Sequence, residues 1–251
     1  LSAVSFFETY DMYLFTLNLK QIQAELLIAE SDLGLLGAFV NAGAFLAVFL
    51  AMAADRFGRR SLLLITIVGY TFFTAATALA PNTEAFVVSQ MLARCFGTAE
   101  LLIAAVVIAE EFDPENRGWG IGAMGAVAAC GAGFASIMFG FVEHVPYGWR
   151  SLYAIGVIPL LFIAYWRRVL PETQKFESAV QIREPVMKNV GDLFTRMPKR
   201  TIAFFVAVFG LILCSRSATF FAPKYLQDVQ GWEPSSVALL SFAGGALAIV
   251  G

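Results

Sequence analysis

Residues 55–80 read DRFGRRSLLLITIVGYTFFTAATALA, a short basic segment followed at once by a long apolar one. The apolar part, Leu62 to Ala80, carries no charge and is close to the ~20 residues with which a helix crosses about 30 Å of hydrocarbon. Basic residues beside such a run are typical of the cytoplasmic end of a membrane-spanning helix. This stretch therefore predicts a chain that crosses a membrane as helices.

The rest of the chain repeats the pattern. Hydrophobic residues make up 59% of the sequence and charged residues 14%, whereas about a quarter of a soluble domain is charged. Only helices or closed barrels satisfy the backbone in lipid, so each apolar block is expected to be a helix. The predicted spans are roughly 1–18, 33–54, 61–80, 84–109, 119–142, 151–168, 201–223 and 235–251. We expect an all-α integral membrane protein, truncated to about eight spans because both ends fall within apolar blocks.

Basic residues are unevenly distributed between the two sets of loops. They gather in 55–60, in 110–118, and at or in the long loop after the sixth predicted span, where Arg167 and Arg168 are grouped with the basic residues of 169–200; the other side carries Lys20, Arg150 and Lys224. The excess places 55–60, 110–118 and 169–200 in the cytoplasm of a cell (inner or plasma) membrane protein. Aromatic residues at the outer ends fit interfacial anchors: Tyr147, Trp149 and Trp232.

The polar segment 169–200 interrupts the regular spacing of the spans and contains several prolines. It predicts a division into a six-helix half at 1–168, a cytoplasmic linker at 169–200 and the start of a second half at 201–251. The single histidine, His144, excludes a site built on several imidazoles. No metal site, cofactor or nucleic-acid partner is predicted; the expected partners are the lipid bilayer and a small solute.

The loop between the second and third spans has the spacing D-R-x-G-R-R. A glycine allows a tight turn and the arginines can simply anchor the helix ends. The spacing nevertheless resembles the signature of the major facilitator superfamily of transporters, with Ala51 where that family usually has glycine. Further resemblances lie at 110–118 (EEFDPENRG), at 167–173 (RRVLPET, similar to sugar-porter-like members) and at 8–11 (ETYD, similar to the D-G-Y-D element of metabolite:proton symporters).

The resemblance implies a helical bundle built of three-helix repeats, acting as a monomer. It also implies a cytoplasmic gate in which the loop after the second span pairs with acids at the end of the fourth span or with the other half. The candidate gating residues are Asp55, Arg56, Gly58, Arg59, Arg60, Glu110, Glu111 and Arg117. A purely topological role for the basic residues is the alternative.

Charges inside the spans recur every third helix. Glu8 and Asp11 lie in the first span, Arg94 and Glu100 in the fourth, and Arg216 in the seventh. A charge within the hydrocarbon is costly and persists where it pairs or faces water. In this superfamily the substrate and coupling-ion sites lie near the midplane, between repeats. Because the charged spans recur every third helix, we expect their charged side chains to line one shared cavity.

Helical geometry separates the candidate roles. Glu8 and Asp11 are three residues apart and share a helix face, where their mutual repulsion favours proton binding by one of them. Arg94 and Glu100 are about 120° apart around their helix, so Arg94 is expected to face Asp11 or Glu8 instead. We assign proton coupling to Asp11, Glu8 and Glu100, and substrate binding to Arg94, Arg216 and Asn41. A structural salt bridge, or for Asn41 an interhelical hydrogen bond, is the alternative.

These residues predict a secondary active transporter that moves a small organic acid by alternating access with proton symport. A sugar or other polar metabolite uniporter or symporter, or a drug efflux antiporter, is the alternative within the class. A membrane-bound enzyme or a sensor is the alternative outside it. We expect no enzymatic activity, because no nucleophile–base or metal constellation is evident.

Overall fold

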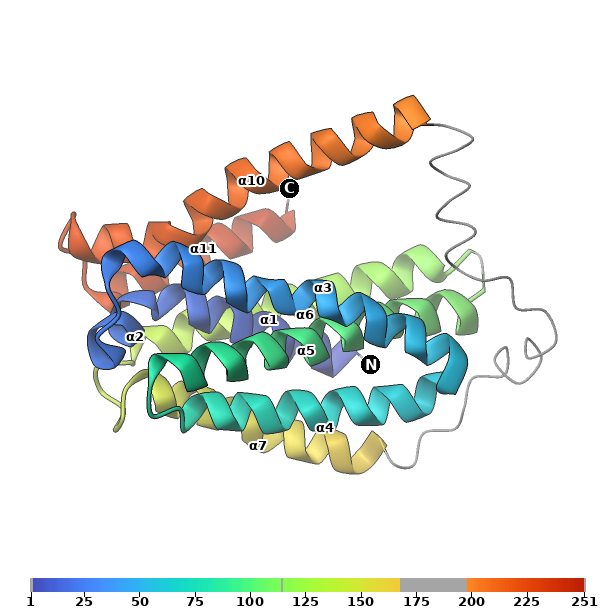
Figure 1. Cartoon of the computed structure of the whole chain (residues 1–251), viewed down its shortest axis with the longest axis horizontal. Helices are drawn as coiled ribbons and strands as arrows, with labels where there is room; N and C mark the ends of the chain where they lie inside the picture. Colours follow the sequence, from blue (N-terminus) through green and yellow to red (C-terminus); the bar gives the residue numbers. More distant parts are fainter. Residues whose placement is uncertain (1, 114, 168–197, 251) are drawn as a thin grey trace.

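The computed structural model describes residues 2–113, 115–167 and 198–250. Side chains are described in these ranges apart from those of residues 2, 55–57, 111 and 247–250. Most of the predicted linker, 168–197, therefore lies outside the described residues. Every described element is a helix, and the helices run along the long axis of the molecule (Figure 1).

Helices occupy all eight predicted spans. Their bounds are α1 (Ser2–Leu17), α3 (Leu33–Phe57), α4 (Arg59–Ala78), α5 (Thr83–Glu111), α6 (Arg117–Gly140), α7 (Trp149–Arg167), α10 (Pro198–Asp228) and α11 (Pro234–Val250). Of these, α3 to α7 and α10 are long and apolar enough to cross a membrane on their own, while α1 and α11 have 16 and 17 residues. The prediction of an all-helical membrane bundle is confirmed.

Two short elements follow α1 that the apolar pattern did not predict. They are α2 (Leu19–Leu26) and the 3₁₀ turn η1 (Glu30–Asp32). Helix α2 is mostly polar and buries Leu19 and Ile22. It is followed by the capping residue Leu27, whose backbone has φ of 54°. A polar helix of eight residues gives no membrane-span signal, so the sequence analysis treated it as a loop.

Close packing of the helices depends on glycine at two crossings. A Cβ on Gly131 of α6 would lie 2.1 Å from the carbonyl oxygen of Phe6 in α1, and one on Gly43 of α3 would lie 2.0 Å from that of Met91 in α5. Small residues let helix backbones approach closely in lipid, where there is no hydrophobic drive to associate. These contacts hold α1 against α6 and α3 against α5, and thereby set the positions of the charges carried by α1 and α5.

One predicted interfacial anchor is in fact a core residue. Trp149 is 1% exposed, packs edge-on against Phe86 and Tyr153, and has the guanidinium carbon of Arg150 4.5 Å from the centre of its ring. The prediction for Trp149 was wrong because the tryptophan begins α7 and points inward, whereas Tyr147 is 83% exposed as expected.

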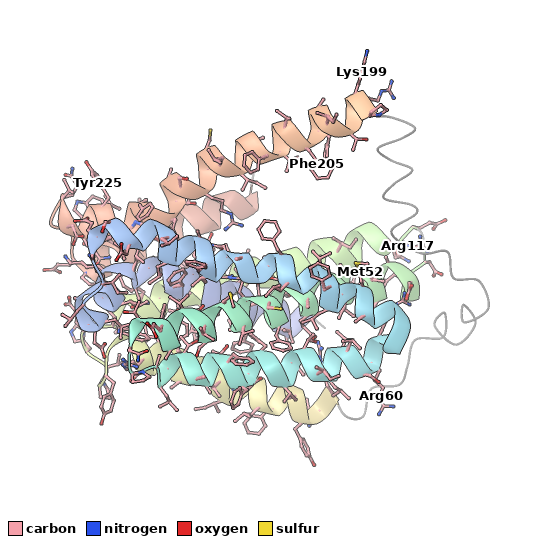
Figure 2. The ribbon with its side chains drawn as sticks, in the orientation of Figure 1. Met52, Arg60, Arg117, Lys199, Phe205 and Tyr225 are labelled. Carbon is pink, nitrogen blue, oxygen red and sulfur yellow. The ribbon has the colours of Figure 1, made fainter. Side chains whose placement is uncertain are left out.

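The basic loops lie together at one end of the bundle. Figure 2 shows Arg60, Arg117 and Lys199 at the end opposite to Tyr225. The helices therefore bring the described residues of the predicted cytoplasmic loops to a common face, as alternating membrane crossings require.

Candidate functional site

The charges of the first and fourth spans meet inside the bundle. Glu8 on α1 and Arg94 on α5 are 7% and 5% exposed, and Arg94 Nη1 lies 3.6 Å from Glu8 Oε1. The expectation that Arg94 faces an acid of the first span is confirmed. Helix α1 crosses α5 with this ion pair between them, so the cation of one helix compensates an anion of the other.

Asp11 lies one turn along α1 and is 3% exposed, but it has a different partner. The Nε2 of Gln90 donates a hydrogen bond of 3.4 Å to Asp11 Oδ1. Among the described residues no cation lies within ion-pair distance of Asp11, although Arg94, the partner of Glu8, also interacts electrostatically with Asp11. Asp11 is thus a buried carboxylate whose direct partner is a neutral amide.

Gln90 was not predicted as a site residue. It is fully buried and stands four residues before Arg94, so α5 presents the amide and the guanidinium on one face. The available signal was a polar side chain at helical spacing from Arg94 in an otherwise apolar stretch. Without a charge, Gln90 did not stand out from the other neutral polar residues of the spans.

Aromatic side chains enclose the acids. The hydroxyl of Tyr70 on α4 donates to the carbonyl oxygen of Phe7 at 2.7 Å, and that of Tyr10 donates to the carbonyl oxygen of Leu152 on α7 at 2.7 Å. Gly97 leaves space for Glu8, because a Cβ there would lie 2.9 Å from Glu8 Cγ. The carboxylates consequently sit among packed rings and backbone, where electrostatic interactions are stronger than in water.

The other two substrate-binding candidates are more exposed. Arg216 on α10 faces α1, with Nη1 3.8 Å from the sulfur of Met12, and interacts electrostatically with Glu8. Asn41 on α3 donates to the carbonyl oxygen of Gly37 at 2.8 Å, one turn earlier in the same helix. The interhelical hydrogen bond considered for Asn41 was therefore wrong: the side chain bonds within its own helix.

Glu100 belongs to a separate buried cluster. It is fully buried, forms an ion pair with Arg167 of α7 and accepts a hydrogen bond from the hydroxyl of Thr66 of α4. This cluster lies on the face of α5 that is turned toward α4 and α7, as the 120° offset from Arg94 requires. The sequence analysis grouped Arg167 with the basic loop residues, which was wrong, because its side chain is 4% exposed inside the bundle.

The predicted gate is partly described. Arg59 at the start of α4 forms an ion pair with Glu110 at the end of α5, so the loop after the second span does bind the end of the fourth. Gly58 has φ of 93°, a conformation that favours glycine, and links α3 to α4. The side chains of Asp55, Arg56 and Glu111 lie outside the described residues.

The remaining basic residues of the gate lie nearby at the same end. Arg60 is exposed beside Arg59, and the Nε of Arg117 donates to the carbonyl oxygen of Phe112 at 3.2 Å. Arg117 therefore holds the turn between α5 and α6 rather than an acid of another helix.

Apolar helices that enclose paired charges define a polytopic membrane protein with a polar site between its helices. The chain matches the Major Facilitator Superfamily over residues 1–251, and it belongs to that family. It is accordingly a multi-pass protein of the plasma membrane, from a family of transporters and not of enzymes.

Two curated relatives and one solved structure illustrate the likeness. The chain is 26% identical over 209 residues to a probable 4-methylmuconolactone transporter of Cupriavidus pinatubonensis, covering 81% of this chain and 49% of the relative. It is 22% identical over 239 residues to a putative niacin/nicotinamide transporter of Bacillus subtilis, covering 94% and 57%. The crystal structure of a D-xylose–proton symporter superposes with a TM-score of 0.73 at 16% identity, over 99% of this chain and 65% of that one. The chain thus spans about half the length of these curated relatives.

Proposed function

We propose that the full-length protein is a secondary active transporter that carries a small organic acid together with a proton by alternating access. The observation that supports proton coupling is the unequal pairing of the two acids on α1. Glu8 is compensated by Arg94, whereas Asp11 has only the amide of Gln90 as its direct partner. A buried carboxylate with no cation in direct contact is less stabilised as an anion than one held in an ion pair, so Asp11 is the group better suited than Glu8 to bind and release a proton.

The proposed anionic substrate follows from the sign of the remaining charges. Arg94 and Arg216 project from α5 and α10 toward the acids of α1, and both are cationic. Proton binding at Asp11 would leave the site with an excess of positive charge, which favours a carboxylate substrate. The relatives named for 4-methylmuconolactone and for niacin/nicotinamide support a small organic metabolite, and niacin is itself a carboxylic acid. The sugar alternative is supported by the sugar-porter-like stretch 167–173 and by the likeness of fold to the xylose symporter.

In this proposal residues 1–168 form one half of a monomeric transporter, and α10 and α11 begin the second half. The support is that α10 lies apart from the bundle over much of its length (Figure 1). Glu100 then acts within the first half, where its pairing with Arg167 favours a structural role over the coupling role expected from the sequence.

The test is uptake by the full-length protein in proteoliposomes. An inward proton gradient is imposed, and accumulation of radiolabelled niacin, a muconate-type acid and xylose is compared with and without a protonophore. We expect gradient-dependent accumulation of at least one acid and none of xylose. Accumulation of xylose alone would refute the substrate class, and acid uptake that ignores the gradient would refute symport.

A further inference from the structure

A cavity lies at the end of the bundle opposite to the predicted cytoplasmic loops, between α2, the turn after α6 and the start of α7 (Figure 1). Its volume is about 530 Å³, within the range of about 300–1,000 Å³ that is typical of sites for small molecules. Ala24 and Val142 supply apolar parts of its wall, and polar parts come from Gln21, Glu25 and Glu143. No lining residue belongs to the gate or to the proposed proton site, so the cavity needs its own explanation.

One acid at the cavity lacks a compensating cation. Glu25 pairs with Arg150 at 2.7 Å, so its charge is neutralised within the protein. Glu143 is exposed, and no cation of the described residues lies within ion-pair distance of it. An exposed acid on a convex surface is simply solvated, but Glu143 lies in the wall of a hollow, where the electric field is focused. The cavity therefore carries an unbalanced negative charge, which favours a cationic ligand.

Tyr147 supplies an aromatic ring to the same cavity. Its backbone has φ of 61°, a left-handed conformation that is uncommon for a bulky side chain, and the residue is 83% exposed. Packing of the ring in the core therefore does not account for this conformation, and strained residues gather where proteins bind ligands. The ring of Trp149 is already covered by the guanidinium of Arg150, so Tyr147 is the ring that remains available to a cation.

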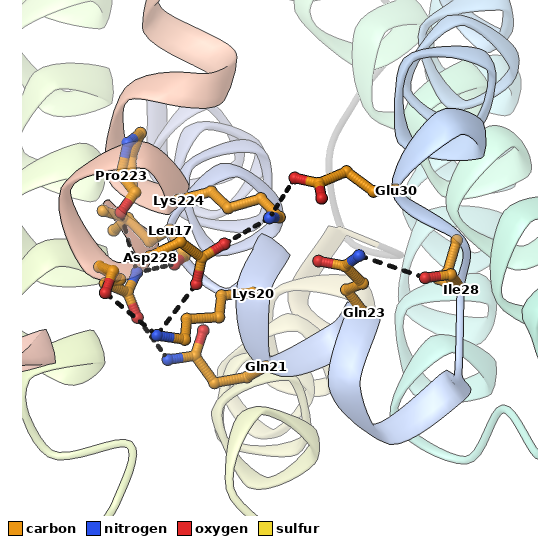
Figure 3. Close-up of polar contacts among 10 residues, drawn as sticks. Leu17, Lys20, Gln21, Gln23, Ile28, Glu30, Pro223, Lys224 and Asp228 are labelled. Carbon is orange, nitrogen blue, oxygen red and sulfur yellow. Dashed lines mark hydrogen bonds and ion pairs between the residues drawn. The ribbon is translucent and has the colours of Figure 1, made fainter. Parts of the chain in front are cut away.

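Two polar atoms of lining residues are buried without a hydrogen-bond partner in the described part of the chain. Gln21 Nε2 donates to Gln227 Oε1 of α10 at 2.8 Å (Figure 3), whereas Gln21 Oε1 is buried and accepts no hydrogen bond. Trp149 is 1% exposed, and its indole Nε1 is buried and donates none. A buried polar atom is costly to leave unpaired, so both atoms call for a partner from outside the protein. A hydroxyl group suits both, because it can accept from an N–H and donate to a carbonyl oxygen.

We propose that this cavity binds a small organic ammonium ion that carries a hydroxyl group. Glu143 compensates the charge of the ligand, and the ring of Tyr147 contacts its ammonium group. The hydroxyl group bonds to the unpartnered atoms of Gln21 and Trp149. A metal ion fits less well, because the described residues contain no group of three or more His, Cys, Asp or Glu that could hold one. The ligand is opposite in charge to the proposed solute, so the two sites take different compounds.

The experiment is an equilibrium binding assay on the full-length protein in detergent micelles, with radiolabelled choline as the probe. Choline has both the ammonium and the hydroxyl group. Its uncharged isostere 3,3-dimethylbutan-1-ol loses the ionic and the cation–π attraction and should compete about 3- to 25-fold more weakly. Tetramethylammonium keeps the charge but lacks the hydroxyl group and should compete about 2- to 12-fold more weakly than choline. Equal affinities for choline and the uncharged alcohol, or no binding of choline, would overturn the proposal.

Variants of the two exposed lining residues locate the bound probe. Glu143→Gln and Tyr147→Asn should each weaken choline binding by about 2- to 5-fold. Asparagine tolerates the left-handed conformation, so Tyr147→Asn should also keep the unfolding temperature of the parent. The matched control is Glu84→Gln, which removes an exposed acid at the start of α5 that does not line the cavity and should leave the affinity unchanged. Parental affinity in both lining variants would place the choline elsewhere and refute the site.

A lipid headgroup is a second source of an ammonium group near the membrane surface. The headgroup of phosphatidylcholine has no free hydroxyl group, so a short-chain phosphatidylcholine should compete no better than tetramethylammonium. Competition stronger than that of choline itself would assign the cavity to lipid and contradict the proposal. The binding assay requires no transport, so its failure refutes only this site, whereas a failed uptake assay refutes the proposed transport.

Discussion

Replacing Glu8 by glutamine should destabilise the protein strongly, because it leaves the guanidinium of Arg94 buried without its anion. The two groups are 3.6 Å apart with side chains 9% and 5% exposed, so at an effective dielectric constant of about 20 their attraction is ~5 kcal/mol before desolvation. Removing one partner of such a pair costs about 3–5 kcal/mol in free energy of unfolding. We therefore expect Glu8→Gln and Arg94→Gln each to lower the free energy of unfolding by about 3–5 kcal/mol.

The double variant isolates the interaction energy between Glu8 and Arg94 from the effect of each substitution on the surrounding residues. Because Glu8→Gln with Arg94→Gln removes both charges, its loss should be well below the sum of the single losses, with a coupling energy of about 2 kcal/mol or more. The assay is unfolding in detergent micelles, followed by circular dichroism. The control cycle on Glu25 and Arg150, whose side chains are 45% and 19% exposed, should give at most about 1 kcal/mol. A Glu8–Arg94 coupling energy no larger than that of the control would refute the buried pair.

Two further predictions concern packing and the second buried cluster. Gly43→Ala should destabilise the protein by about 1–3 kcal/mol, because the added Cβ would lie 2.0 Å from the carbonyl oxygen of Met91. The control Gly122→Ala should be nearly neutral, since a Cβ there would have nothing within 4 Å. Thermal unfolding in detergent compares the two variants, and equal effects would contradict the close crossing of α3 and α5. Glu100→Gln should cost about 3–5 kcal/mol and be largely rescued by a second change, Arg167→Gln. The same unfolding assay tests this, and a double variant as unstable as the sum of the singles would mean that the two side chains do not compensate each other.

The helices and the central pair were predictable from the sequence. Apolar blocks of membrane-spanning length fixed the eight long helices, because the hydrocarbon leaves few other backbone structures. Charges are costly in the same medium, so those retained within the spans were expected to pair or to face water. The sequence therefore predicted that Arg94 faces an acid of the first span, either Asp11 or Glu8, and the structure shows that its ion pair is with Glu8.

The features that the sequence analysis missed depend on which way a side chain points or which distant elements meet, and the composition of a segment shows neither. Arg167 ends an apolar run next to a basic segment, and only the packing of α7 against α4 and α5 shows that its side chain turns inward to Glu100. Trp149 was misplaced for the same reason. Helix α2 is too polar and short to give a span signal, and its contacts with α10 join residues about 200 positions apart, as the bond between Gln21 and Gln227 illustrates.

The most direct test of the proposed coupling is the Asp11→Asn variant of the full-length protein in proteoliposomes. Asparagine keeps the shape of the side chain and a hydrogen-bonding partner for Gln90 but cannot carry the proton. The account predicts that accumulation driven by a proton gradient is lost, while exchange of labelled for unlabelled substrate continues. The control Glu84→Gln, which removes an exposed acid at the start of α5, should retain both. Gradient-driven accumulation at the parental rate in Asp11→Asn would contradict the account.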